Sequence, residues 1–192
     1  QFPSVVLAGN KTLLAEVKAV TPTYPLRGEV RVAPRPYAPD APTDSIPADG
    51  EAWLDARLIA QLGIEPGAVV SVGASKLRAT QVIAYEPDRG GDMFSIAPRL
   101  MMNAADLPET RLIQLGSRIS YRLLVAGEAD NIDGYRAWLK PELPASAQMQ
   151  GVRDSRPEMR VALDRAEQFL SLAALVSVVL AGVAIAISGR RY

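Results

Sequence analysis

The sequence predicts an α+β protein that runs into one long apolar helix, and three observations support this fold class. Short runs that alternate apolar and polar residues, as strands do, occur early and late in residues 1–152. Helical patterns bounded by capping residues, glycine or proline lie between these runs. Residues 169–188 form a stretch of twenty residues without a charge. This order favours a mixed layer of strands and helices followed by a separate helix.

The N-terminal region predicts a β-hairpin followed by an extended arm. Residues 2–8 and 13–20 have the pattern of antiparallel strands, with a Gly-Asn turn between them. A strand at the first residues also suggests that the sequence is a piece of a longer protein. Seven of the fifteen prolines fall in residues 21–47. Proline removes a backbone donor, so we expect a connector with at most an edge strand at residues 28–33; a polyproline recognition segment is the alternative.

The middle of the chain predicts a second unit, residues 48–114. Asp49 can cap a helix over residues 51–62, and Gly63 can end it. Two short strands and a helical turn are then expected at residues 68–72, 77–85 and 104–107.

The next stretch returns to longer elements. Residues 119–125 alternate as a strand with one buried face does, and a helix capped by Asp130 and stopped by Pro141 follows. Residues 148–152 suit a returning strand. We therefore expect residues 1–47 and 115–153 to form one layer, into which the second unit is inserted.

The apolar stretch has the length of a membrane span. Twenty helical residues at ~1.5 Å each cover about 30 Å, the thickness of the hydrocarbon core. A buried core helix is the alternative, although such helices are usually shorter. The expected membrane-spanning side chains include those of Phe169, Leu172, Leu175, Val179, Gly182 and Ile185.

The charges that flank this stretch predict its orientation. Arg190 and Arg191 follow it closely, and positive charge beside a short span is retained on the cytoplasmic side. We therefore expect residues 1–168 to face outward. Ser155 and Glu158 have the spacing of a capping box, so residues 154–168 should form a stalk helix that continues into the span.

Small residues recur along the expected span. Ala173, Ser177 and Ala181 form one row, and Gly182 belongs to a second. Such rows allow two helices to approach closely in lipid, so we expect packing against another span; ordinary lipid-facing composition is the alternative.

The composition excludes several classes of function. The formal net charge is zero, so the sequence carries no electrostatic signature of nucleic-acid binding. It contains no histidine, which is the commonest general base in enzymes, and no cysteine, which supplies thiolate nucleophiles. Recognised phosphate-binding and nucleophile motifs are absent, and turn and cap roles explain the pairs Asp88/Asp92 and Asp130/Asp133 better than a cation site does. We expect no enzyme activity, cofactor or metal.

A methionine-rich cluster is the one candidate for contact with a cargo. Met93, Met101 and Met102 lie near Phe94 and Leu100, and flexible thioethers suit adaptable apolar surfaces. Packing in the core of the second unit explains the same residues, and the sequence favours that explanation.

Three segments carry a family resemblance. They are AWLDARLIAQLGIEPGAVVSVG, SRISYRLLVAGEADNIDGYRAWLKPEL and RVALDRAEQFLSLAALVSVVLAGVAIAISGRRY, of which the last is the most specific. Together they resemble the FtsX-like or MacB-type ABC transporter permease family, and more closely its YbbP-like predicted permeases. Ala68 stands where that family often has aspartate.

The resemblance implies a particular architecture and role. It implies a ferredoxin-like porter lobe at residues 1–47 and 115–153, an inserted Sabre-like lobe at 48–114, a stalk at 154–168 and a transmembrane helix at 169–188. It places the protein in the bacterial inner membrane with residues 1–168 in the periplasm. Its implied partners are a cytoplasmic ATPase subunit, a second permease subunit and membrane lipid, and its implied role is export or mechanotransmission on a hydrophobic or protein cargo. The alternative is a membrane-anchored binding or scaffold module without transport.

Overall fold

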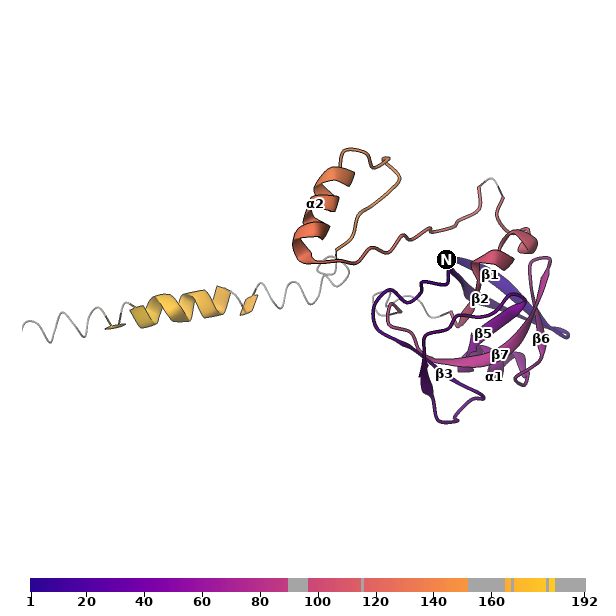
Figure 1. The fold of residues 1–192 in the computed structure, drawn as a ribbon. Coiled ribbons are helices and arrows are strands. Elements are labelled where there is room, and N and C mark those ends of the chain that lie inside the picture. Colours follow the sequence, from indigo (N-terminus) through magenta and orange to yellow (C-terminus); the bar gives the residue numbers. More distant parts are fainter. Residues whose placement is uncertain (90–96, 115, 152–164, 167, 179, 182–192) are drawn as a thin grey trace, which may run out of the picture. The chain divides into compact units, whose positions relative to one another are not determined.

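The computed structural model describes residues 1–89, 97–114, 116–151, 165–166, 168–178 and 180–181 (Figure 1). They belong to two compact units, residues 1–134 and 135–192, which we treat separately. The strands are β1 (Phe2–Ala8), β2 (Lys11–Val20), β3 (Val30–Ala33), β4 (Ala41–Thr43), β5 (Glu51–Asp55), β6 (Val69–Val72), β7 (Ser75–Tyr85) and β8 (Arg99–Asn103). The helices are α1 (Ala56–Leu62) and α2 (Ala129–Leu139), and short 3-10 turns occupy η1 (Ala104–Asp106) and η2 (Pro108–Thr110).

The predicted N-terminal hairpin is confirmed. β1 and β2 pair in antiparallel register, with Val5 opposite Leu14 and Ala8 opposite Lys11. Gly9 occupies the turn at a φ of 56°, a conformation that glycine adopts without steric cost. The alternation along β1 places Val6 in the core and its neighbour Val5 outside, as a strand with one buried face requires.

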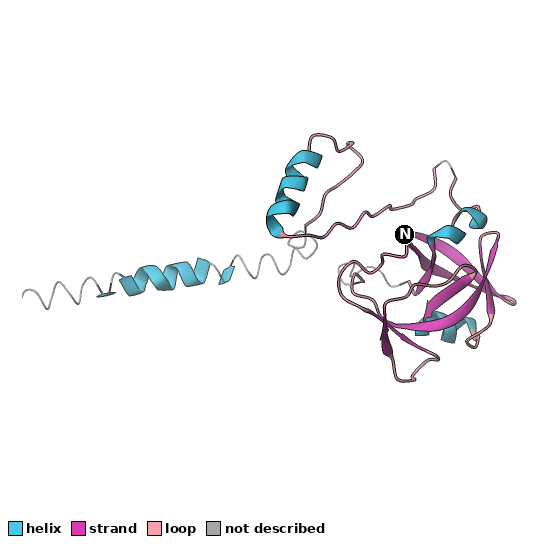
Figure 2. Cartoon of the chain, viewed as in Figure 1, coloured by secondary structure: helices cyan, strands magenta, loops and turns pink. Residues whose placement is uncertain are grey.

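Six strands close into a barrel. The sheet order is β4-β3-β7-β5-β8-β2-β1-β6, and β6 also pairs with β7. The six strands from β7 to β6 in this order therefore form a closed ring. Two of the pairs, β2 with β8 and β5 with β7, are parallel. The β3–β4 hairpin continues along β7 past the end of β6, and Figure 2 shows this extension beside the barrel strands.

The barrel interior is the hydrophobic core. Its largest fully buried side chains come from all six barrel strands and from α1, and they are Val6, Val17, Leu54, Leu58, Val70, Val72, Leu77, Leu100 and Met102. Burying such a side chain contributes roughly 1.5–3 kcal/mol relative to exposure. α1 packs on the core through Leu58, Ile59 and Leu62, and it ends at Gly63 as predicted, with Gly63 in the left-handed conformation at a φ of 67°.

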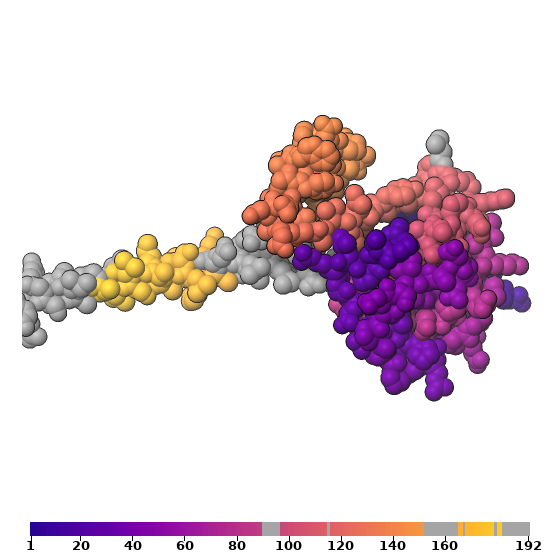
Figure 3. Space-filling model, in the orientation of Figure 1, coloured from indigo at the N-terminus to yellow at the C-terminus, as the bar shows by residue number. Residues whose placement is uncertain are grey.

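The predicted inserted unit is not a separate lobe. β5 lies between β7 and β8, and β8 pairs with β2, so strands from residues 1–47 and 48–114 share one sheet and one core. The space-filling view shows these strands as one continuous mass (Figure 3). The prediction failed because the joining pairs, β2–β8 and β1–β6, link residues far apart in sequence, which local patterns do not reveal.

The predicted helix over residues 51–62 is half wrong. Residues 51–55 form strand β5, and the helix begins only at Ala56. Its N-cap is Asp55, whose carboxylate accepts a hydrogen bond from the Arg57 backbone N–H at 2.8 Å, and not Asp49. Strand β5 pairs on both edges and buries Ala52 to Asp55 consecutively, so it lacks the alternation that identifies a strand exposed on one face.

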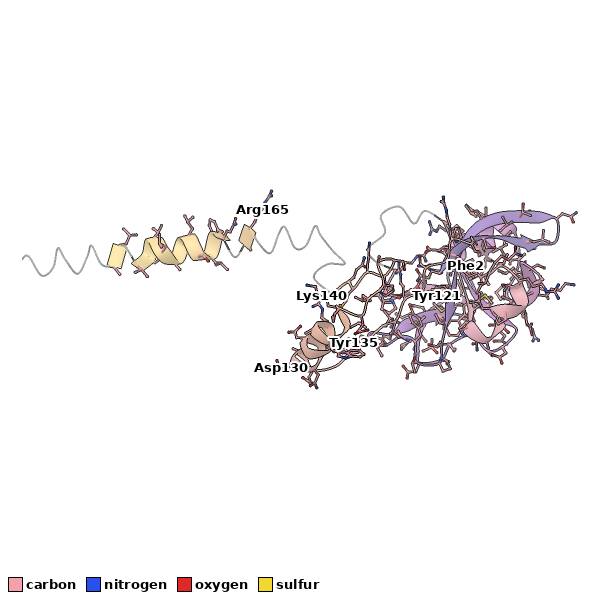
Figure 4. The ribbon with its side chains drawn as sticks, turned by 90° about the horizontal axis from the view of Figure 1, so that it is seen from above. Phe2, Tyr121, Asp130, Tyr135, Lys140 and Arg165 are labelled. Carbon is pink, nitrogen blue, oxygen red and sulfur yellow. The ribbon has the colours of Figure 1, made fainter. Side chains whose placement is uncertain are left out.

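The predicted strands at residues 119–125 and 148–151 are not found, and residue 152, the last of the second prediction, lies outside the described residues. Residues 118–128 and 147–151 have no regular secondary structure, and Tyr121 and Leu123 are 76% and 82% exposed. The predicted helix is confirmed as α2, which stops before Pro141, but it begins at Ala129, so Asp130 lies in its first turn and is not its cap, and none of its residues is buried. Figure 4 marks Tyr121, Asp130 and Tyr135 along this stretch. The mixed architecture is compatible with an α+β class, whereas the ferredoxin-like and Sabre-like lobes are not confirmed.

Candidate functional site

The apolar C-terminal segment is helical where it is described. Residues 168–178 and 180–181 are helical, and Phe169, Leu172 and Leu175 are each about two-thirds or more exposed to solvent. In the described part of the chain, no helix is long and apolar enough to cross a membrane. The remaining residues named for the span and its cytoplasmic anchor lie outside the described residues; they are Val179, Gly182, Ile185, Arg190 and Arg191.

The row of small residues lies on this helical segment. Ala173, Ser177 and Ala181 are all helical and exposed. The Ser177 hydroxyl donates a hydrogen bond to the Ala173 carbonyl at 2.8 Å. That bond gives the Ser177 hydroxyl an acceptor within its own helix, so the hydroxyl needs no water molecule as an acceptor.

A buried ionic network joins one strand of the barrel to the segment after β7. Lys18 of β2 donates to Glu86 at 2.5 Å and to both oxygens of Asp88 at 2.7 Å. The Tyr24 hydroxyl donates to Asp88 at 2.6 Å, and the Lys18 ammonium lies 4.1 Å from the centre of the Tyr24 ring. The Glu86 side chain is completely buried and that of Lys18 is 6% exposed, so this cation and anion are paired away from water.

Arg99 extends the network to a second strand. Its Nε donates to the other Glu86 oxygen at 3.0 Å, and its Nη1 lies 3.0 Å from the Glu16 carboxylate. Glu86 therefore binds cations from both β2 and β8, the parallel pair of strands in the barrel. Removing one partner of a buried ion pair typically costs about 3–5 kcal/mol, because a charge is left uncompensated.

Two groups of the network titrate abnormally. Burial works against ionisation of Asp88, but hydrogen bonds from Lys18 and Tyr24 outweigh it and hold the pKa of Asp88 below its usual range. Burial and the hydrogen bond to Asp88 raise the pKa of Tyr24 far above its ordinary value. These shifts keep Asp88 ionised and Tyr24 neutral near neutral pH, so the hydrogen bond that the Tyr24 hydroxyl donates to Asp88 is retained there.

The predicted cargo contact is wrong for two of its three residues. Met101 and Met102 lie on β8 between β5 and β2, and both are completely buried. They pack in the core, the alternative that the sequence already favoured. Met93 lies outside the described residues.

The first carboxylate pair considered for a cation has one described member, Asp88. Asp88 is already bound by Lys18 and Tyr24, while Asp92 lies outside the described residues. In the described part of the chain, no group of three or more carboxylates, histidines or cysteines is placed to hold a metal. Lys18, Glu86 and Arg99 were not predicted as site residues. The one signal in the sequence was Lys18, a lysine at a core-facing position within a strand.

The comparisons with known proteins place the chain in a family. No protein-family model matches it, and no solved structure matches it. Over 191 residues the chain is 35% identical to a membrane transport protein, and the match covers all of this chain and 23% of that relative. The class is therefore that of ABC transporter permeases, and the chain belongs to that family.

The relative is the uncharacterized ABC transporter permease YbbP of Escherichia coli strain K12. The expected resemblance to YbbP-like permeases is thus confirmed. Because the chain spans about a quarter of that relative's length, the match describes one region of a longer permease.

Proposed function

We propose that the chain is the extracytoplasmic region and adjoining membrane span of an ABC transporter permease subunit of the FtsX-like or MacB type. The observation that carries this proposal is the 35% identity along the whole chain to a permease. In this proposal, residues 1–168 lie in the periplasm of a bacterial cell and residues 169–188 cross the inner membrane.

The exposed apolar helix supports the span. Seven large apolar side chains between residues 169 and 180 are exposed, which lipid would cover and water would not favour. They are Phe169, Leu170, Leu172, Leu175, Val176, Val178 and Leu180. The internal hydrogen bond of Ser177 also suits a helix in lipid, where each polar group must be satisfied within the protein. Arg190 and Arg191 would then anchor the cytoplasmic end.

The unpaired segment supports a porter lobe completed by further chain. Ile119, Tyr121, Leu123 and Val125 keep the alternation of a strand, yet residues 118–128 form no strand among the described residues, and Ser120 exchanges two backbone hydrogen bonds with Gln1 at 2.8 and 2.9 Å. Tyr121, Leu123 and Val125 are exposed. We propose that a segment of the longer permease supplies the missing partner and completes a porter lobe that includes residues 115–153.

The proposed mechanism is mechanical. A cytoplasmic ATPase subunit and a second permease subunit would bind the membrane part, and a continuous stalk helix over residues 154–168 would transmit their motion to the barrel. The work would act on a hydrophobic or protein cargo, and the chain itself would catalyse no reaction.

The test compares a broken and an intact stalk in the full permease with its ATPase. One variant replaces Asp164 and Arg165 by glycine, and the matched variant replaces both by alanine. Glycine costs about 1 kcal/mol per residue relative to alanine in a helix interior, so only the first variant should lose stalk rigidity. We expect the glycine variant to hydrolyse ATP and assemble normally while its export falls at least several-fold.

Two outcomes would contradict the proposal. Equal export by the glycine and alanine variants would show that stalk rigidity transmits nothing. If no ATPase subunit copurified with the permease from native membranes, the membrane-anchored binding module would be favoured instead.

A further inference from the structure

We propose that a depression on the barrel, lined by Arg35, Arg57 and Arg89, binds a phosphate group. The depression encloses about 560 Å³, within the range of sites that hold small ligands. The proposal concerns residues 1–89 alone and does not depend on the stalk mechanism.

Three parts of the chain build the rim. The loop between β3 and β4 contributes Arg35 and Asp40, the start of α1 contributes Arg57, and Arg89 follows β7. Tyr37 also lines the rim, where it is almost completely exposed at a φ of 64°, in the left-handed region that tyrosine rarely adopts. Strained residues of this kind concentrate at ligand sites, which agrees with the proposal.

Asp55 holds two of the arginines in place. Its Oδ2 accepts a hydrogen bond from Arg89 at 2.6 Å and another from Arg57 at 3.2 Å, while its Oδ1 accepts the Arg57 backbone N–H. Burial opposes its ionisation, but these hydrogen bonds dominate and keep the pKa of Asp55 below its usual value. A single carboxylate therefore positions both guanidinium groups before any ligand arrives.

The lining carries an excess of positive charge. Three arginines line the depression together with two carboxylates, those of Asp40 and Asp55. Asp40 is already bound at 2.7 Å by Arg31, which is not part of the lining. Within the described residues Arg35 has no hydrogen-bond or ion-pair partner for its side chain, so its guanidinium group can face a ligand.

The floor and the number of arginines indicate the chemical class. Small and apolar side chains form the floor, and they are Ala33, Ala38, Ala56, Val82, Ile83 and Ala84. Two arginines are enough for a planar carboxylate, whereas three that come from different elements suit the several oxygens of a phosphate. We therefore assign the site to a phosphate ester with a small uncharged body, either a soluble compound or the headgroup of a phospholipid.

The experiment measures binding to the intact permease in nanodiscs. Glycerol 3-phosphate is titrated by calorimetry into nanodiscs of phosphatidylcholine. In a second arm, nanodiscs with and without phosphatidylglycerol are compared by crosslinking of lipid to the barrel. The variants are Arg35→Gln and, as a matched control, Arg118→Gln, which removes an exposed arginine that lies outside the depression. Both sites are exposed, so neither change should disturb folding.

The expected result is a loss of about tenfold or more in affinity for Arg35→Gln and no change for Arg118→Gln, because one charge-assisted hydrogen bond is typically worth about that much. Binding of glycerol 3-phosphate would identify a soluble ligand, and crosslinking that requires phosphatidylglycerol would identify a lipid headgroup; either supports the site. Absence of both signals, or equal losses in the two variants, would overturn it.

Discussion

The barrel strands and the stretch around Tyr121 have similar sequence patterns but different structures. β2 alternates apolar and polar residues from Ala15 to Ala19, pairs on both edges with β1 and β8, and buries Val17 completely. Residues 119–125 alternate as clearly, yet among the described residues they form no strand, share backbone hydrogen bonds with Gln1 through Ser120 alone, and leave Leu123 82% exposed. Alternation therefore makes a segment able to form a strand, whereas partner strands within reach decide whether it does so.

The largest effect should come from the buried ionic network. Replacing Glu86 by alanine leaves Lys18 and Arg99 without their shared carboxylate inside the protein. We expect the free energy of unfolding to fall by about 3–5 kcal/mol, measured by chemical denaturation. A loss below about 1 kcal/mol would show that the network does not help to hold the barrel.

A pair of leucine substitutions tests the comparison itself. Leu54 is completely buried between two barrel strands, and Leu123 lies in the unpaired stretch. We expect Leu54→Ala to lower the free energy of unfolding by about 2–5 kcal/mol, and Leu123→Ala to change it by no more than about 0.5 kcal/mol. If the porter lobe is completed in the longer permease, Leu123→Ala should become destabilising there. An equally small effect of Leu123→Ala in this chain alone and in the longer permease would contradict the missing-partner proposal.

Acid should weaken the barrel through its carboxylates. The pKa values of Asp55 and Asp88 are lowered in the folded state, so both groups stabilise the fold above their unfolded pKa, near 3.9. This contribution is lost as the pH falls from about 4 through the folded pKa values. Asp88→Asn should be less stable at neutral pH and should lose less stability on acidification, as followed by thermal unfolding. The same acid slope in both proteins would contradict the role of Asp88.

The smallest effect should come from an exposed ion pair. Arg31 and Asp40 lie 2.7 Å apart at the surface, where solvent screens the attraction between them. We expect Asp40→Ala to leave the midpoint of thermal unfolding unchanged within error. A clear loss would show that this pair, which lies within the β3–β4 hairpin, stabilises the fold despite its exposure.

The elements that the sequence predicted correctly depend on residues close together in the chain. The Gly9 turn, the end of α1 at Gly63 and the stop of α2 before Pro141 are all set by local conformational preferences. The strand β5 was taken for a helix because Trp53 and Leu58 also fit a helical stripe, and only pairing with β7 and β8 settles the difference.

The candidate sites depend on contacts that no local pattern reports. Lys18 and Glu86 are 68 positions apart, and Arg89 reaches Asp55 across 34. Such pairs follow from how the strands are ordered around the barrel, so they become visible only with the fold. The apolar C-terminal stretch was visible in the sequence because a run of consecutive residues defines it.

The double pairing of β6 has a mechanical consequence. An open sheet can be peeled apart from its edge one hydrogen bond at a time, but a ring closed by β6 offers no such edge between β1 and β7. A pull on β8, which leads toward the C-terminal helix, must shear the hydrogen bonds to β5 and β2 together. A force along β8 would therefore load both of its ladders at once, and the closed ring would resist it as a single unit.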